Sequence, residues 1–475
     1  MKMLVIKIVM LILCFTQLGE ARTVSLDELL TMVQQNHPLF EKELLSVDIS
    51  TESQKRYLGD RDWIVESSPF IAYENKTGLT NTTYDKLSQI QIGGTLQKKF
   101  WKTGGRLSAS YSSTYADQEY RTFFSRNTSE LFRQQFSITY SHPLLRNQNG
   151  ILDQFEYELA TYAIDFTELQ SKENQENFLL NIAFGFFDWM FLDEQLNINN
   201  ERLRLAEEEL ASSKEKYEAH LIDKVDVLRQ EDARRIAGQD VVLSQSQVTA
   251  KRTELAVLAL SPEISESKPE YDIYSLVTLE EVEQTIGRLN NETRILKALN
   301  VLEEQFTFKT RALSNQKRPQ LDLIVGSSLI DDDQNYGGSF GVNNPSLSLG
   351  LKFTYPLGNH SSKAEVRKTE LEILQLRADR QSVFLDLESS IRSILIQIKE
   401  MENLLSLNLS QIESAKERTL EEMKVYEQGR GDMTFVIQSQ DNEAKARLTY
   451  LQNAIAYHKL VLQYRALRDQ LLHTE

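Results

Sequence analysis

Few side chains in this 475-residue sequence are spaced for catalysis. Residues 337–341, GGSFG, fit the G-x-S-x-G pattern of serine nucleophiles, which requires a sharp turn between a strand and a helix. This segment instead follows three aspartates at 331–333 and lies between two strand-like stretches, so we interpret it as a loop. The aspartates could bind calcium, although a solvated acidic loop is the simpler interpretation. No P-loop, HExxH or CxxC motif occurs, and the six histidines form no ligand pattern. The sequence therefore predicts no enzyme, no cofactor and no metal site.

A second set of residues recurs at a fixed spacing. YEAHLID begins at Tyr217 and YEQGRGD begins at Tyr426, and each has an aspartate six residues after its tyrosine, Asp223 and Asp432. Both motifs interrupt long, charged, helical sequence. Because glycine tolerates left-handed backbone, Gly429 and Gly431 favour a helix reversal in the second copy. In the first copy the reversal is marked by Leu221-Ile222 and Asp223. An ordinary helix hairpin would explain the glycines but not the recurrence, so we predict a docking surface or a gate at both turns.

The elements around the two motifs are also repeated. Each half contains a first helix, strand-like sequence, a proline, a long helix, the break and a further helix. The prolines are Pro143 and Pro356, which we expect at the strand-to-helix junctions. The first helices are predicted to start at Ser25 and Thr278, each with a glutamate three residues later as in a capping box. We interpret this order as an internal duplication.

The duplication divides the chain into parts. Residues 1–21 combine Lys2 and Lys7, an apolar run and small residues, which is typical of a secretory signal peptide. The first repeat covers 22–262, with strands at about 66–142 and a long helical hairpin at about 152–262. An equatorial linker follows at 263–277. The second repeat covers 278–475, with strands at about 319–356 and a hairpin at about 362–472.

The strand-like segments alternate strictly in polarity. In SLSLGLKFTY, which ends at Tyr355, apolar residues occupy every second position. This pattern is typical of a strand with lipid on one side and water on the other, and also of a strand in a soluble sandwich. The first repeat has additional β-like segments around a Gly104-Gly105 turn. Either four strands cross the membrane there, or two cross and a hairpin extends outside.

The long helices and the charge narrow the class of protein. Residues 152–217 and 363–428 each predict a helix of about 66 residues, or about 100 Å, with heptad-like apolar spacing as in a coiled coil. The net charge of −16 argues against nucleic-acid binding. The apolar run that starts at Ile182 is short and contains Asp188, so any membrane crossing is expected to use strands.

The chain resembles the TolC-like outer-membrane factors, the trimeric efflux channels of Gram-negative bacteria. The resemblance covers essentially the whole mature chain and is carried by the duplicated order, SLDELLTMVQQNHP, HPLLRNQNG, YPLGN and the two turns. It implies a mainly helical fold with membrane strands, in which three copies share one β-barrel in the outer membrane and one α-helical tunnel in the periplasm. It implies a passive exit channel for efflux or type I secretion. The implied partners are two further copies, outer-membrane lipid, a periplasmic adaptor (membrane fusion) protein and an inner-membrane RND or ABC transporter.

The resemblance also implies roles for residues at the turns. Tyr426 and Gly429 match the family's second turn, and Asp226 matches the aspartate of the first. The implied gate consists of Asp226, Tyr426 and Phe435, with a ring of three Asp226 carboxylates and Phe435 as an apolar constriction. The implied adaptor-docking residues are Leu221, Ile222, Asp223, Gly429, Arg430, Gly431 and Asp432.

Three positions depart from the family pattern at these turns. His220 replaces a glycine, Phe435 replaces an aspartate, and Gly431 replaces a gating arginine, with Arg430 one position earlier. These departures affect the inter-helix charge link that holds the tunnel shut in the family. The alternative from another class is an exported coiled-coil structural or adhesive protein without a channel.

Overall fold

A computed structural model describes residues 22–75, 85–121, 126–341 and 344–472. The predicted signal peptide lies outside the described residues. The described chain forms two compact units, each built from both halves of the sequence. The first unit comprises residues 22–46, Leu169–Lys297 and 381–472, and the second comprises Val47–Glu168 and Ala298–Arg380. None of the described helices combines the length and the apolar composition that a membrane-spanning helix requires.

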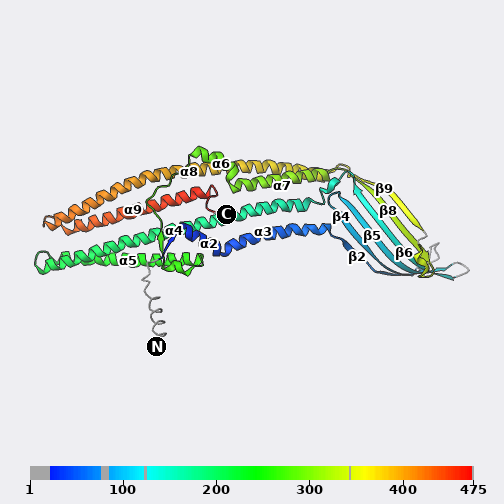
Figure 1. The fold of residues 1–475 in the computed structure, drawn as a ribbon, viewed down its shortest axis with the longest axis horizontal. Coiled ribbons are helices and arrows are strands. Elements are labelled where there is room, and N and C mark those ends of the chain that lie inside the picture. The colour runs from blue at the N-terminus through cyan, green and yellow to red at the C-terminus, as the bar shows by residue number, and fades with distance from the viewer. Residues whose placement is uncertain (1–21, 76–84, 122–125, 342–343, 473–475) are drawn as a thin grey trace, which may run out of the picture. The chain divides into compact units, whose positions relative to one another are not determined.

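Two helical hairpins contain the long helices (Figure 1). The first consists of α4 (Phe155–Glu218) and α5 (Lys224–Leu258), and the second of α8 (His360–Glu427) and α9 (Met433–Ala466). The two repeated motifs provide both turns, at residues 219–223 and 428–432. With 64 and 68 residues, α4 and α8 are several times longer than an ordinary globular helix.

The first helix of each half is divided in two. α2 (Leu26–Asn36) is followed by α3 (Pro38–Arg56), and α6 (Val282–Glu292) by α7 (Arg294–Gln316). The cap at Ser25 is confirmed, because its hydroxyl accepts a hydrogen bond from the Glu28 amide at 3.2 Å. The start predicted at Thr278 is wrong. Glu281 is the N-cap of α6 and makes no side-chain capping bond, so the T-x-x-E pattern does not form a capping box there.

The first unit is held by one apolar core. Most of its buried members come from α2, the middle of α4, the end of α5 and α9, and they include Leu29, Phe186, Trp189 and Leu255. The apolar run around Asp188 therefore lies in a protein core, and Lys459 donates to the Asp188 carboxylate at 2.5 Å. Beside this core, β1 (Thr23–Ser25) pairs in parallel with β7 (Lys268–Glu270), which follows the short η3 helix (Pro262–Glu266).

The hairpin seams follow the heptad spacing. In α4 the buried positions Asn199, Ala206 and Ser213 are seven residues apart, and in α5 the buried positions are Gln230, Ala237 and Ser244. These side chains are small or polar, and Asn199 donates to the Ser244 hydroxyl at 2.7 Å. In α8 the positions Ile391, Ile398 and Leu405 are buried at the same spacing, and counted from the turn motifs they correspond to the buried Ile182, Trp189 and Leu196 of α4. The predicted seam residue Tyr217 is instead exposed.

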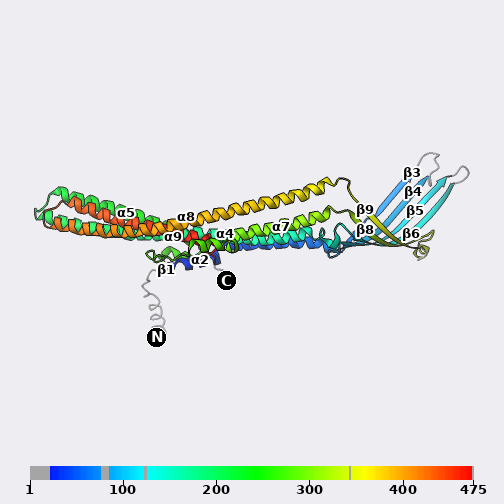
Figure 2. The same ribbon diagram turned by 90° about the horizontal axis from the view of Figure 1, so that it is seen from above.

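The second unit contains one antiparallel sheet of seven strands. The strands are β2 (Ile64–Ser67), β3 (Phe70–Asn75), β4 (Lys86–Phe100), β5 (Gly105–Arg121), β6 (Arg126–Pro143), β8 (Gln320–Asp333) and β9 (Pro345–Thr354). Their order is β2-β4-β5-β6-β8-β9, and β3 pairs with β4 along the same edge as β2. The additional segments of the first repeat therefore belong to the same sheet. Figure 2 shows that this sheet curves, and its two edges are β2/β3 and β9.

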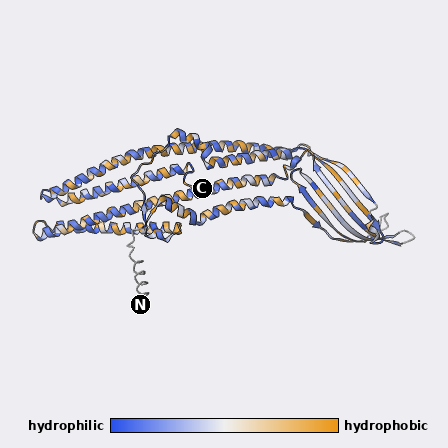
Figure 3. Ribbon diagram, viewed as in Figure 1, coloured by the Kyte–Doolittle hydropathy of each residue, from blue (hydrophilic) through white to orange (hydrophobic). Residues whose placement is uncertain are grey.

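The register separates the sheet into an apolar and a polar face. Directly paired residues of antiparallel strands share a face. One row contains Leu107, Tyr140, Val325 and Leu349, and a row on the opposite face contains Ser110, Ser137, Ser328 and Ser346. The alternation is visible along the strands in Figure 3. Leu347 and Leu349 are 83% and 75% exposed, so the apolar face is uncovered in the single chain.

The loops after the strands place the remaining sequence candidates. Pro143 is the last residue of β6, and a short η2 helix (Gln148–Gly150) leads from it to α4. Pro356 lies between β9 and α8. Ser339 lies in η4 (Gly338–Phe340), between two strands, where its buried hydroxyl donates to the Tyr336 carbonyl at 2.8 Å and accepts from Gln134 at 3.2 Å. It is therefore a structural serine and not one on a strand-to-helix elbow.

Candidate gate and docking site at the hairpin turns

Both hairpins turn with the same backbone geometry. The Leu221 amide donates to the Lys216 carbonyl at 2.9 Å, and the Arg430 amide donates to the Val425 carbonyl at 3.1 Å. These bonds close a helix end around one left-handed residue, which is His220 with φ +65° in the first turn and Gly429 with φ +68° in the second. His220 thus occupies the position of Gly429, and its Nδ1 lies 3.0 Å from the Glu218 carbonyl.

In each motif, the aspartate six residues after the tyrosine is the N-cap of the helix that follows the turn. Asp432 is the N-cap of α9, and its carboxylate accepts from the Thr434 amide at 2.7 Å. Hydrogen bonds from Thr434, together with the nearby Arg229, hold the pKa of Asp432 below its ordinary value. Asp223 is the N-cap of α5 but makes no side-chain capping bond. The two turns therefore share their backbone and differ in how the aspartate is used.

Arg229 connects the two turns. Its guanidinium lies 3.0 Å from the Asp226 carboxylate on its own helix and 3.7 Å from the Asp432 carboxylate of the other hairpin. Asp226 is therefore an ion-paired carboxylate. Sequence reasoning missed Arg229. The i, i+3 spacing to Asp226 was a usable signal for the first pair, but nothing local predicts the second pair, which joins residues 203 positions apart.

Tyr426 makes a second contact between the hairpins. The Lys216 ammonium lies 4.4 Å from the centre of the Tyr426 ring, which is a cation–π distance. Phe435 is 52% exposed, and Gly429, Arg430 and Gly431 are also exposed. The structure thus brings Asp226, Asp432 and Arg229 together, and separately Tyr426 and Lys216, while Phe435 stays at the surface.

The first turn carries an exposed apolar strip. Leu221 is 74% exposed, and Val225 and Leu228 are about half exposed on the following helix turns. Ile222, which the sequence predicts as a docking residue beside Leu221, is partly buried. Val225 and Leu228 were missed, although their spacing of three residues places both on one face of α5.

Further from the turns, a cavity of about 290 Å³ lies between the hairpins. Arg202 of α4 lines this cavity and forms ion pairs with Asp240 of α5 at 3.1 Å and with Asp441 of α9. Gln440 also donates to Glu209, whose pKa is raised by burial. The two hairpins are therefore joined by polar contacts at more than one level.

The fold described above can be compared with those of known proteins. No protein-family model and no curated protein matches the sequence. Solved structures of outer-membrane channels, by contrast, match nearly the entire chain, so the resemblance stated from the sequence is confirmed at the level of the fold.

Three of these structures illustrate the match. The outer-membrane channel OprN is 12% identical, with a TM-score of 0.68 over 94% of this chain and 90% of its own. CusC, a transmembrane channel, is 14% identical, with a TM-score of 0.67 over 95% of both chains. The open state of the MtrE outer-membrane channel from Neisseria gonorrhoeae is 13% identical, with a TM-score of 0.64 over 96% of this chain and 94% of its own.

Proposed function

We propose that three copies of this chain form a passive exit channel in the bacterial outer membrane. In this proposal the three sheets close one β-barrel, and the long helices form a tunnel on the periplasmic side. A periplasmic adaptor docks at the hairpin turns and links the channel to an inner-membrane RND or ABC transporter. Substrates of an efflux or type I secretion system would then pass outward without chemical change.

The observation that carries the proposal is the open, two-faced sheet. An uncovered apolar face suits lipid, and the serine-rich face suits a water-filled lumen. β2 and β3 pair one after the other with the same side of β4, so together they count as one strand across the sheet. The sheet is then six strands wide, and neighbouring strands run in opposite directions. Because six is even, β9 of one copy can pair antiparallel with β2/β3 of the next, and identical copies can form a closed ring. Three such sheets would supply eighteen strands.

The hairpin turns support a gate at the other end of the helices. The link from Arg229 to Asp432 and the contact from Lys216 to Tyr426 hold the two hairpins of one chain together. Opening would require these exposed contacts to separate, and the apolar strip at Leu221 offers a surface on which an adaptor could act. An exported adhesive rod is not favoured, because it would require neither a lipid-suited sheet face nor the channel fold.

Reconstitution into planar bilayers tests the function. We expect the purified wild-type chain to fractionate with outer membranes, to form trimers in mild detergent and to produce discrete conductance steps. The Asp226→Ala variant is expected to change cation selectivity, because it removes a carboxylate from each tip and leaves Arg229 with Asp432 as its one remaining ion-pair partner among the described residues. A chain that is soluble without detergent and gives no conductance would overturn the proposal. Unchanged selectivity of the variant would remove only Asp226 from the gate.

A further inference from the structure

A cationic cavity lies in the second unit, where the β4–β5 turn meets the start of α4. Its volume is about 550 Å³. Four of its lining residues are basic, Arg61, Lys98, Lys99 and Lys102, whereas Glu158 is the acidic residue of its wall. The remaining wall is rich in aromatic rings, among them Phe100, Trp101, Tyr140 and Tyr157. The cavity therefore has an excess of positive charge that nothing in the proposed channel mechanism uses.

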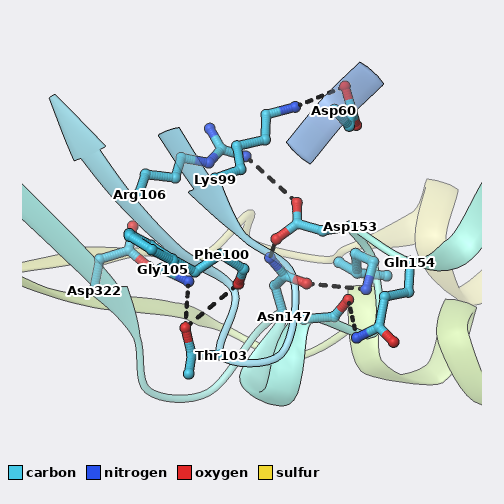
Figure 4. A network of polar contacts seen from close by, with 12 residues as sticks. Asp60, Lys99, Phe100, Thr103, Gly105, Arg106, Asn147, Asp153, Gln154 and Asp322 are labelled. Carbon is cyan, nitrogen blue, oxygen red and sulfur yellow. Dashed lines mark hydrogen bonds and ion pairs between the residues drawn. The ribbon is translucent and has the colours of Figure 1, made fainter. Parts of the chain in front are cut away.

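The basic residues differ in how they are paired. Lys99 is neutralised by Asp60 at 3.2 Å, and the neighbouring Arg106 lies 3.9 Å from Asp153, as Figure 4 shows. Arg61 and Lys98 instead lie over aromatic rings, at 5.6 Å from Trp101 and 5.3 Å from Trp63. In the part of the chain that the structure describes, no carboxylate forms an ion pair with Arg61, Lys98 or Lys102. These three cations are available to an anion.

The turn that presents them is fixed in place. Gly104 has φ +73°, and a Cβ there would collide with the Asn147 carbonyl, so only glycine fits. The side-chain amide of Gln154 donates a hydrogen bond from Nε2 to the Trp101 carbonyl at 3.0 Å. This bond joins the turn to the residue just before α4. A Cβ on Gly150 would also collide with this carbonyl. The cavity is therefore preformed and rigid on the side of the turn.

The sheet register sets what kind of anion fits. Lys98 pairs with Leu107, which in turn pairs with Tyr140, so Lys98 and Tyr140 lie in a row of the apolar face. Phe100 follows two residues later on that face and is 39% exposed. A ligand in the cavity would thus have its anionic group at the cations and any apolar tail along the face that continues through Leu107 and Leu96. This arrangement matches an amphipathic anion better than a free one.

We propose that this cavity binds the phosphate of an anionic phospholipid headgroup, with the acyl chains on the apolar sheet face. Arg61, Lys98 and Lys102 contact the phosphate, and the aromatic rings border the glycerol region, as amphipathic rings do at a membrane interface. The proposal rests on the proposed function in one respect, that the sheet lies in a membrane. Each chain of an assembly would hold its own lipid at the helix end of the sheet.

Native mass spectrometry of the wild-type chain in detergent tests this site. The probes are phosphatidylglycerol, phosphatidylcholine with the same acyl chains, and glycerol 3-phosphate. We expect phosphatidylglycerol to bind more tightly than phosphatidylcholine. The triple variant Arg61→Gln, Lys98→Gln, Lys102→Gln should weaken that binding by about tenfold or more, because three cations near one phosphate are removed. The single variant Lys102→Gln should weaken phosphatidylglycerol binding less than the triple variant, and we expect it to keep the fold because the side chain is exposed.

The control carries the same change in charge at another place. Lys399→Gln, Arg418→Gln and Lys424→Gln alter exposed positions of α8 in the first unit and should leave phosphatidylglycerol binding unchanged. Equal binding of the two lipids, an equal loss in the control, or displacement of phosphatidylglycerol by an equal concentration of glycerol 3-phosphate would overturn the proposal. Bilayer recordings of the wild-type chain in neutral lipid are scored separately. A lack of conductance there counts against the channel, while lipid binding in detergent is still measured.

Discussion

At the scale of single residues, Arg229 is the most informative position of the turns. Its two ion pairs are open to solvent, and such pairs contribute little to stability. We therefore expect Arg229→Gln to leave the melting temperature almost unchanged but to raise the fraction of time that the channel is open in planar bilayers. Arg235→Gln is the matched control, because Arg235 pairs within α5 alone among the described residues. An open fraction that changes equally in both variants would show that Arg229 does not restrain the hairpins.

The left-handed residues give a second test at the turns. A side chain in this backbone region costs about 1–2 kcal/mol. His220→Gly should therefore stabilise the first turn, and Gly429→Ala should destabilise the second by a similar amount, since nothing lies within 4 Å of the added Cβ and only the backbone is strained. Hydrogen exchange of the turn amides measures both changes. Faster exchange in His220→Gly would mean that the ring contact with Glu218 outweighs the strain.

His458 is expected to make the first unit sensitive to acid. The buried ring stacks on Phe187, donates from Nε2 to the Ile273 carbonyl at 3.1 Å, and accepts from the Tyr271 hydroxyl at 3.3 Å. Burial lowers the pKa of His458. Two charged groups lie nearby: Asp272 acts to raise this pKa, and Arg465 acts to lower it. Because the folded state resists protonation, its stability is complete above about pH 6.5 and falls as the pH drops toward the lowered value.

The measurement is the melting temperature of the wild type and of His458→Gln between pH 7 and pH 5. Gln can make similar hydrogen bonds but does not titrate, so its curve should be flatter. Burial raises the pKa of Asp469. Its effect on stability has the opposite sign, because the folded state holds the Asp469 proton more tightly than the unfolded state does and is therefore favoured by acid. The difference between the two curves therefore isolates the histidine. Parallel curves would exclude His458 as the source of the acid sensitivity.

At the scale of elements, the seam of the first hairpin depends on small side chains. Ser213 is a buried seam position of α4, only 2% exposed. Ser213→Leu should destabilise this hairpin by about 1–3 kcal/mol, because overpacking forces the helices apart. Ser212→Leu makes the same change at an exposed position of α4 and should be nearly neutral. Urea unfolding in detergent measures the free energy of unfolding of the two variants. An equal loss of stability in both would contradict the tight packing of this seam.

The sequence predicted the elements better than their ends and long-range partners. Alternation with a period of two identified β8 and β9, and heptad spacing identified the long helices, because both signals are repeated many times. The false capping box at Thr278 is a four-residue signal that the packing of α6 overrides. The β1–β7 pair and the link from Arg229 to Asp432 join residues far apart in sequence, and no local pattern encodes them.

At the scale of the whole molecule, folding and assembly are expected to be coupled. A single chain leaves Leu347, Leu349 and Leu351 exposed and both sheet edges unpaired. We therefore expect the melting temperature in mild detergent to rise with protein concentration, as it does when subunits stabilise one another, and native mass spectrometry to show a trimer. A monomer whose melting does not depend on concentration would contradict the closed ring.

The two unpaired edges also have a genetic consequence. A copy whose β9 was deleted would still offer β2 and β3 to a neighbour and could enter the ring, but it would leave a gap where the next copy should join. Such a truncated allele, expressed beside the intact gene, would spoil most assemblies that it enters and would behave as dominant over the wild type.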